Sequence, residues 1–240
     1  MIIYKDCVQG IREHVRPKSV DVCITSPPYN IGTTYNVYDD VMPMYKYLDW
    51  TADWIHAVDY ALKEDGSFFL NVGSKPSQPE TPFRVLDVAL RTFKLQNTIH
   101  WIKSVAIDNV TYGHYKPINS YRFVNDCHEY IFHLTKTCQV AIDRTSIGVP
   151  YVDKSNIGRY SSTDIHCRGN TWFIPYETIQ MKRNHPAQFP RALPSMCIRL
   201  HGRHKTHLVM DPFAGSGTTE SVCKVLKIDF IGFEIDESYK

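Results

Sequence analysis

Several common chemical signatures are absent from this 240-residue chain, and each absence narrows its function. The 7 cysteines form no Cys-x-x-Cys pair and the 11 histidines form no His-Glu-x-x-His pattern, so no metal site is predicted. There is no signal peptide, no apolar run of membrane length and no internal repeat. With scattered thiols, this predicts a reduced, cytoplasmic protein without a membrane partner.

A large excess of charge is also absent. The net charge is only +2, so any surface that binds an acidic partner must be local. Hydrophobic residues make up 43% of the chain, enough for a sizeable core. We therefore expect a single globular α/β domain over residues 1–240.

A glycine-rich segment near the C-terminus, Asp211-Pro-Phe-Ala-Gly-Ser-Gly-Thr-Thr219, is the first of two informative motifs. The apolar run 207–210 predicts a buried strand, and residues 218–227 have helical spacing. Between them, Gly215 and Gly217 permit positive φ and close approach of a ligand. Such a turn presents free N–H groups at a helix N-terminus. The alternative is an ordinary tight turn between strand and helix.

A second strand, predicted at 229–233, ends in Glu234. An acidic residue at this position can bind both ribose hydroxyls of a nucleotide, and it follows the glycines at the required spacing of about 20 residues. The glycine turn and Glu234 together predict a site for an adenosyl cofactor.

The second motif, Thr25-Ser-Pro-Pro-Tyr-Asn30, follows a predicted strand at 20–25. Pro27 and Pro28 break that strand and lie where ligands bind in open α/β sheets. The Ser26 hydroxyl and the Pro27 carbonyl are suitable acceptors for the hydrogens of a base amine, and Tyr29 offers a face for an extruded base. The alternative is a proline turn with Tyr29 as core filler.

With both motifs in this order, the chain resembles the β group of amino-methylating DNA methyltransferases, in which the catalytic motif precedes the cofactor motif. Segments 62–72, 98–103 and 128–136 resemble the family's later elements, and 170–172 and 185–190 match its segment around the methionine end of the cofactor. The resemblance implies a doubly wound, Rossmann-like sheet with a circularly permuted motif order. It also implies S-adenosylmethionine as cofactor and double-stranded DNA as partner.

The resemblance assigns residues to two roles. Asp6 matches the acidic position that contacts the cofactor adenine. The implied catalytic residues are Ser26, Pro27, Pro28 and Tyr29. The implied cofactor-binding residues are Asp6, Cys7, Ser26, His185, Pro186, Phe189, Asp211, Pro212, Phe213, Gly215, Ser216, Gly217, Thr218, Thr219 and Glu234.

The target is less defined. Ser-Pro-Pro-Tyr is most common in cytosine-N4 enzymes, which makes site-specific methylation of cytosine N4 the favoured activity; adenine N6 and an RNA base amine are alternatives. A non-catalytic nucleic-acid-binding relic is the alternative from another class. No Pro-Cys motif of the kind used for carbon-5 methylation is present.

Two segments are candidates for nucleic-acid contact. Residues 111–123 interleave aromatic and basic side chains, including Tyr112, His114, Lys116 and Arg122, although a tyrosine-rich surface loop would look the same. A small target-recognition insert is expected at about 137–169; a solvated loop is the alternative. It carries Arg144, Lys154, Arg159 and Arg168.

Two further features concern the site and the assembly. His128 and Glu129 are adjacent on a predicted strand and face opposite sides, so Glu129 is expected to be a structural or substrate-orienting group rather than half of a dyad. The chain stops at Lys240, just after the acidic strand, where the family usually continues into a helix. A bare sheet edge there would favour a homodimer.

Overall fold

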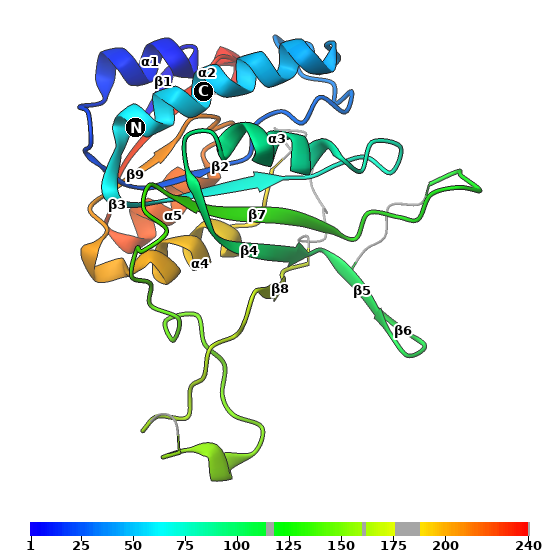
Figure 1. Cartoon of the computed structure of the whole chain (residues 1–240), viewed down its shortest axis with the longest axis vertical. Helices are drawn as coiled ribbons and strands as arrows, with labels where there is room; N and C mark the ends of the chain where they lie inside the picture. Colours follow the sequence, from blue (N-terminus) through cyan, green and yellow to red (C-terminus); the bar gives the residue numbers. More distant parts are fainter. Residues whose placement is uncertain (114–117, 160–161, 176–187, 240) are drawn as a thin grey trace.

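The computed structural model describes residues 1–113, 118–159, 162–175 and 188–239 and is built on one 8-stranded sheet (Figure 1). Five strands run parallel: β1 (Ile2–Tyr4), β10 (Asp229–Glu234), β9 (Leu208–Asp211), β2 (Val20–Thr25) and β3 (Leu62–Val72). Next to β3 lies the antiparallel β7 (His128–Thr135), followed by β4 (Lys94–Ile102) and β8 (Thr171–Phe173). The strand order is β1-β10-β9-β2-β3-β7-β4-β8.

Helices cover both faces of the sheet. One layer contains α1 (Cys7–His14), α2 (Met44–Ala61) and α3 (Thr81–Ala89), and the other contains α4 (Ala192–His201) and α5 (Thr218–Leu226) (Figure 1). All of β2 is buried for this reason: Cys23 packs with the first layer, and Val22 and Ile24 pack with the second. This arrangement confirms the predicted doubly wound α/β fold.

The crossovers reverse direction between β9 and β2. From β2 the chain passes through α2 to β3, whereas from β9 it passes through α5 on the opposite face to β10. Parallel sheets bind ligands at such a switch point, outside the carboxyl ends of the strands. Both informative motifs begin there, at Thr25 and Asp211.

The strands expected at 20–25, 207–210 and 229–233 and the helix expected at 218–227 are present within a residue or two. The apolar spacing of residues 45–62 also predicts a helix, with Asp65-Gly66 as its stop signal. That helix is α2, which ends at Ala61, but Asp65-Gly66 lies inside β3. The pairing of β2 with β3 shifts register between Val20 and Val22, so residues 63–66 form an irregular stretch. A Cβ on Gly66 would lie 2.8 Å from Leu62 Cγ, which explains the glycine.

The premise of a bare edge beside the acidic strand is also wrong. β10 pairs on one side with β9 and on the other with β1, from Ile2↔Gly232 to Tyr4↔Glu234. After β10 the chain adds the 3-10 turn η3 (Glu237–Tyr239). The structural reason for expecting a homodimer therefore falls away.

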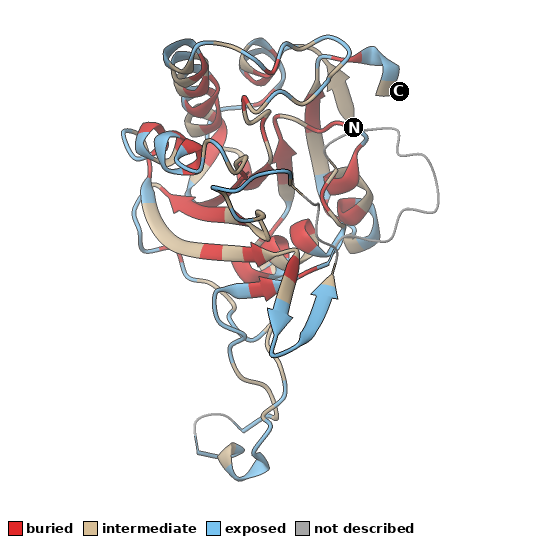
Figure 2. Cartoon of the chain, turned by 90° about the vertical axis from the view of Figure 1, so that its right-hand side faces the viewer, coloured by how far each residue is buried: buried red, intermediate tan, exposed pale blue. Residues whose placement is uncertain are grey.

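Several segments project from the body of the molecule, and two of them are long (Figures 1 and 2). One is a hairpin of β5 (Ser104–Ile107) and β6 (Val110–Gly113), and the other is the segment between β7 and β8, which contains the short turn η1 (Lys154–Asn156). Figure 2 shows both as largely exposed or half-buried, in contrast to the buried sheet. The second projection coincides with the expected insert at 137–169.

The 3-10 turn η2 (Arg203–Lys205) follows α4. No helix of the described residues is long and apolar enough to cross a membrane.

Candidate active site

A cleft with about 940 Å³ of empty space, part of it open to solvent, lies at the carboxyl ends of β1, β10, β9 and β2. Many residues predicted from the sequence to bind a cofactor meet in its wall, although they come from distant parts of the chain. They are Asp6, Cys7, Ser26, Phe189, Pro212, Phe213, Gly215, Ser216, Thr218 and Glu234. Pro28, predicted to be catalytic, also lines the cleft.

The glycine-rich loop wraps tightly against β10. Ala214 N donates to Phe233 O at 2.9 Å, and Gly215 N donates to Glu234 Oε2 at 2.9 Å. Gly215 and Gly217 both have positive φ, +50° and +80°, as expected. Their surroundings differ, because Gly215 lines the cleft whereas a Cβ on Gly217 would point at Ile2 Cδ1, 3.2 Å away. Backbone conformation therefore favours glycine at both positions, and of the two only Gly215 lines the cleft, where its predicted ligand would lie.

The Asp211 carboxylate lies behind the loop rather than in the cleft. Its Oδ1 accepts from Thr25 Oγ1 at 2.7 Å and Phe213 N at 3.1 Å, and its Oδ2 accepts from Thr219 Oγ1 at 2.7 Å. Burial raises the pKa of Asp211 to about 6, against the lowering effect of these hydrogen bonds. Asp211 and Thr219 are hydrogen-bonded to each other and thus stabilise the glycine-rich loop, which is the predicted cofactor cradle.

Glu234, predicted to bind the ribose hydroxyls, lines the cleft. Its Oε1 accepts from Asp236 N at 2.9 Å, so each oxygen already has one backbone donor, and burial raises its pKa. A carboxylate has roughly four lone-pair sites, which leaves capacity for further donors. Across the cleft, Asp6 caps α1 by accepting from Val8 N and Gln9 N at 3.0 and 3.2 Å. The thiol of Cys7 is buried beside it, and burial raises its pKa.

The Ser-Pro-Pro-Tyr motif follows β2 and is tied to two other strands. The hydroxyls of Ser26 and Tyr29 lie 2.6 Å apart, and Tyr29 donates to Glu129 Oε2 on β7 at 2.9 Å. Asn71 of β3 donates from Nδ2 to the Tyr29 hydroxyl and to Glu129 Oε2, each at 2.7 Å. Lys103 Nζ lies 3.1 Å from Glu129 Oε1. Glu129 therefore has the orienting position expected for it, whereas Asn71 and Lys103 were not anticipated.

The two prolines have different surroundings. Pro27 is buried, and the carbonyl of Pro28 accepts from the hydroxyl of Tyr47, which is fully buried in α2, at 2.9 Å. The Pro28 carbonyl is thus engaged by the protein itself. The Pro27 carbonyl and the Ser26 hydroxyl therefore remain the two predicted acceptors for the hydrogens of a base amine, and we call this pair the amine clamp.

The loop at 31–43 forms one wall of the cleft and is organised by Asp40. The carboxylate of this buried residue accepts from the backbone N–H groups of Asn30, Ile31 and Thr33 at 2.7, 3.1 and 2.9 Å. Farther along, Asn36 Nδ2 donates to Asp236 Oδ2 at 2.8 Å, which links the loop to the chain beyond β10. Its Tyr35, Val37 and Tyr38 line the cleft together with Trp50 and with Ser26 and Pro28 of the Ser-Pro-Pro-Tyr motif.

The segment expected at the methionine end is described only in part. His185 and Pro186 lie outside the described residues. Phe189 is nearly buried in the cleft wall, and the neighbouring Gln188 donates from Nε2 to Thr218 Oγ1 at 2.8 Å. Gln188 is a further cleft residue that sequence reasoning did not single out.

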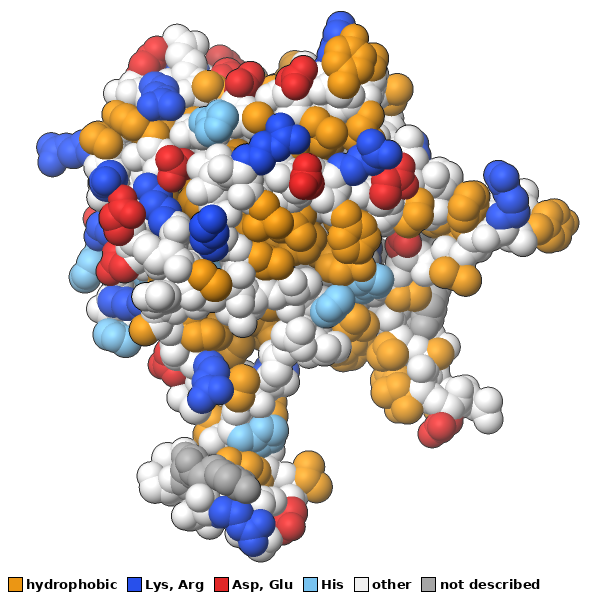
Figure 3. Space-filling view, in the orientation of Figure 1, with side chains coloured by type: hydrophobic (Ala, Val, Ile, Leu, Met, Phe, Trp, Pro, Cys, Tyr) orange, Lys and Arg blue, Asp and Glu red, His pale blue; other side chains and the backbone are white. Residues whose placement is uncertain are grey.

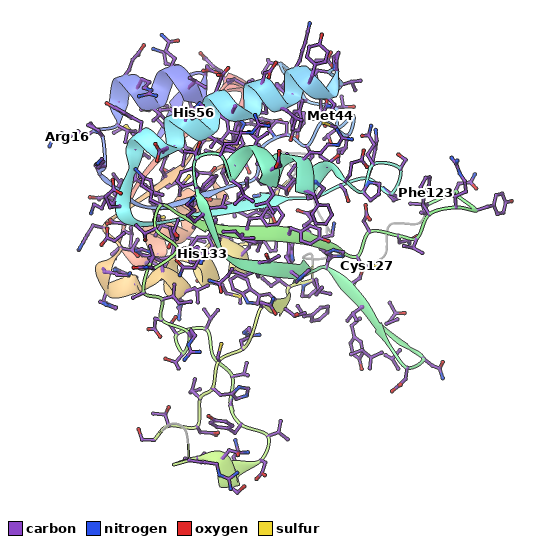
Figure 4. All side chains as sticks on the ribbon, viewed as in Figure 1. Arg16, Met44, His56, Phe123, Cys127 and His133 are labelled. Carbon is purple, nitrogen blue, oxygen red and sulfur yellow. The ribbon has the colours of Figure 1, made fainter. Side chains whose placement is uncertain are left out.

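The predicted nucleic-acid-binding residues that the structure describes lie on exposed segments, and none of them lines the cleft. Tyr112 is on β6 and Arg122 on the exposed loop that follows, whereas His114 and Lys116 lie outside the described residues. Figure 4 labels Phe123, next to Arg122, on this projecting loop, and Arg122 lies over its ring at 5.1 Å.

The other four predicted residues, Arg144, Lys154, Arg159 and Arg168, are exposed on the insert. Lys154 is paired with Asp164 at 2.6 Å, and Arg168 Nε donates to Ile147 O at 2.9 Å. Figure 3 shows a recess between the insert and the β5–β6 hairpin. Among the described residues, no group of three or more His, Cys, Asp or Glu side chains is placed to hold a metal ion.

Known proteins are similar to this chain in sequence and in fold. A sequence profile of the N6_N4_Mtase family, described as DNA methylase, matches residues 20–240. Type II methyltransferase M.SmaI from Serratia marcescens is 30% identical over 98% of this chain and 85% of its own length. DNA adenine methyltransferase YhdJ from Escherichia coli (strain K12) is 29% identical over 99% of this chain and 79% of its own length.

Solved structures agree. PvuII DNA methyltransferase (cytosine-N4-specific) has a TM-score of 0.73 at 23% identity and covers 99% of this chain and 82% of its own. M1.HpyAVI in complex with SAM has a TM-score of 0.58 at 22% identity, over 100% of this chain and 95% of its own. The chain therefore belongs to the N6_N4_Mtase family of DNA methylases and is a DNA amino-methyltransferase.

Proposed function

We propose that the protein transfers a methyl group from S-adenosylmethionine to N4 of a cytosine extruded from double-stranded DNA. The observation that carries this proposal is the arrangement of Ser26. Its hydroxyl lies at the cleft wall, within 2.6 Å of the Tyr29 hydroxyl and a short distance along the chain from the predicted acceptor carbonyl of Pro27.

The cleft fits the proposed cofactor. Glu234 is available to the ribose hydroxyls, and Gly215 allows the backbone to approach the ligand closely. Asp6 is the matching group for the adenine, and Tyr35, Tyr38 and Trp50 supply an apolar wall. When bound, S-adenosylmethionine supplies an electrophilic methyl group.

The residues of the motif supply the rest of the chemistry. An exocyclic amine is a poor nucleophile because its lone pair is conjugated with the ring. Acceptors at Ser26 and Pro27 favour the tetrahedral nitrogen that attacks, because they are fixed where positive charge develops. The Tyr29 ring, held by its hydroxyl, offers a face to the extruded base.

Adenine N6 is the second candidate target. YhdJ, an adenine methyltransferase, is 29% identical to this chain over nearly its whole length. Serine accepts a hydrogen from either amine, so the motif favours cytosine without excluding adenine. Recognition of the surrounding sequence is assigned to the insert at 137–169 and to the segment around Tyr112 and Arg122, because both project beyond the cleft.

One experiment tests the reaction and the target together. Duplex DNA, single-stranded DNA and structured RNA are incubated with the protein and methyl-tritiated S-adenosylmethionine, and the labelled nucleosides are identified by mass spectrometry. N4-methylcytosine in duplex DNA is the expected product. N6-methyladenine would support the second candidate, label in RNA alone would overturn the DNA substrate, and no label would overturn the cofactor assignment or the reaction.

A further inference from the structure

A chain of hydrogen bonds leads from the cleft wall into the sheet. It starts at Ser26 Oγ, continues 2.6 Å to the Tyr29 hydroxyl and then 2.9 Å to Glu129 Oε2. Ser26 borders the cleft, whereas Glu129 is only 8% exposed. The chain therefore connects the predicted amine clamp to a nearly buried carboxylate.

The direction of each hydrogen bond follows from counting donors at the Tyr29 oxygen. The Asn71 amide nitrogen can only donate, and it lies 2.7 Å from this oxygen. An ionised carboxylate can only accept, so the single hydroxyl hydrogen of Tyr29 points at Glu129. Ser26 must then donate its own hydrogen to Tyr29. Asn71 Nδ2 lies 3.4 Å from Ser26 Oγ and can use one of its lone pairs, which leaves the other for a substrate hydrogen.

Glu129 is fixed from three sides. Asn71 Nδ2 donates to its Oε2 at 2.7 Å, and Lys103 Nζ lies 3.1 Å from its Oε1. The third contact is Gly73, where an added Cβ would lie 2.9 Å from Tyr29 Cε2 and 3.1 Å from Glu129 Cδ. Because Gly73 has no side chain, the Tyr29 ring and the Glu129 carboxylate can pack against its backbone. This packing holds the two groups at hydrogen-bonding distance.

We propose that Ser26, Tyr29 and Glu129 form a proton relay that carries one hydrogen of the target amine to Glu129 during methyl transfer. This inference deepens the proposed function and rests on it. Ser26 touches the substrate amine, and Glu129 acts through Tyr29 as the terminal acceptor. Removal of the proton matters because the amine nitrogen gains a positive charge as it acquires the methyl group.

The amine nitrogen forms a bond to the methyl carbon of the sulfonium donor, and the pair of electrons from the broken carbon–sulfur bond stays on sulfur. The nitrogen loses a proton to Ser26 Oγ, Ser26 passes its original proton to Tyr29, and Tyr29 passes its own to Glu129. The products are the neutral methylated amine, a thioether and a protonated Glu129, which returns its proton to solvent before the next turnover.

Two variants interrupt the relay at different points while keeping the shape of the site. Glu129→Gln retains an oxygen that can accept from Tyr29 but cannot take up a proton. Tyr29→Phe retains the ring for base stacking but removes the linking hydroxyl. Each should slow single-turnover methyl transfer about 100-fold or more, the effect of losing general base catalysis, and the double variant should be no slower than the worse single one.

Four measurements separate a relay from a merely structural role. Cofactor affinity by calorimetry should be unchanged in both variants. Extrusion of a 2-aminopurine placed at the target position should be unchanged in Glu129→Gln, which keeps the Tyr29 hydroxyl. The wild-type single-turnover rate should show a solvent deuterium isotope effect with more than one proton in flight, and both variants should lose that multi-proton pattern. Glu80→Gln, a change to an exposed carboxylate on the surface, should match the wild type in every readout.

The outcomes are distinct. If Glu129→Gln fails to fold because the ion pair with Lys103 is lost, the double variant Glu129→Gln with Lys103→Gln, which removes both charges, takes its place in the same assays. Wild-type rates in the Glu129 and Tyr29 variants, or additive losses in the double variant, overturn the relay while leaving the methyltransferase intact. Absence of any labelled base amine with wild-type protein overturns the proposed function itself.

Discussion

The stability of this protein should fall steeply in mild acid because of two buried histidines. His133 on β7 and His201 at the end of α4 approach the Ser67 hydroxyl from two sides, at 2.9 and 2.8 Å. Asn97 donates to the remaining His133 nitrogen at 2.9 Å, which requires a neutral ring. Burial, aided by positive neighbours, lowers the pKa of His133 to about 3 and that of His201 to about 4.

The shifted pKa values determine how the free energy of unfolding changes with pH. Below the unfolded-chain value of about 6.5, the unfolded state binds protons that the folded state refuses, so stability falls with pH down to the folded pKa values. Between pH 8 and pH 5 each histidine lowers the free energy of unfolding by about 2 kcal/mol, and the two together lower it by about 4 kcal/mol. Asp211 opposes them: its raised pKa of about 6 means that its ionisation is disfavoured in the fold. Between pH 8 and pH 5 its cost shrinks by about 1.4 kcal/mol, which leaves a net loss of about 2.5 kcal/mol.

Urea unfolding at pH 8 and pH 5 measures this loss directly. His133→Gln and His201→Gln should each reduce the loss between these pH values by about 2 kcal/mol, because each removes one titrating group. His56→Gln, on the exposed side of α2, should leave it unchanged; Figure 4 labels both His56 and His133. A pH dependence in either buried-site variant equal to that of the wild type would refute the reasoning.

Three further predictions concern ligands. Glu234→Gln should weaken S-adenosylmethionine binding by about 1.5–3 kcal/mol, the value of hydrogen bonds to a charged group, as measured by calorimetry. Both Gly215→Val and Gly217→Val should lower the unfolding temperature because of their positive φ, +50° and +80°. Only Gly215→Val should also abolish that binding, because Gly215 lines the cleft whereas a Cβ on Gly217 would face Ile2; equal effects of the two on binding would contradict this distinction. Arg122→Gln should weaken DNA binding for every sequence and flatten its salt dependence, as loss of a phosphate contact does, and Arg159→Gln should relax the preferred site; unchanged binding in both would place the DNA elsewhere.

The sequence was sufficient to predict the elements that carry local patterns. The strands of both motifs and the helix after the glycines have apolar runs and turn residues at fixed spacing, and each is present. The hairpin of β5 and β6 had a usable signal that was not used: Asp108-Asn109 joins two short strands, and Asp108 has a φ of +52°. The role of Asp65-Gly66 was wrong, because this pair has the composition of a helix end although it lies in an irregular part of β3.

The partners of the catalytic motif could not be predicted in the same way. Asn71 and Glu129 are 58 residues apart and become neighbours because β3 and β7 pair in antiparallel register, with Asn71 opposite Ile131. Lys103 approaches them from beyond the end of β4. No local pattern fixes that register. Alternation along β7 did show that Glu129 and His128 face opposite sides, which is why an orienting role for Glu129 was accessible from sequence.

The link between the two motifs explains how they work together from opposite ends of the chain. β2 and β9 are neighbours in the sheet, with Val22 opposite Val209, and each strand ends where its motif begins. At that point Thr25 Oγ1 donates to Asp211 Oδ1 at 2.7 Å, between two fully or nearly fully buried residues. One strand pairing and one buried hydrogen bond therefore fix the distance between the motif predicted to bind the base amine and the loop predicted to bind the cofactor. Because neither depends on chain order, the catalytic motif can precede the cofactor motif without altering the geometry of the site.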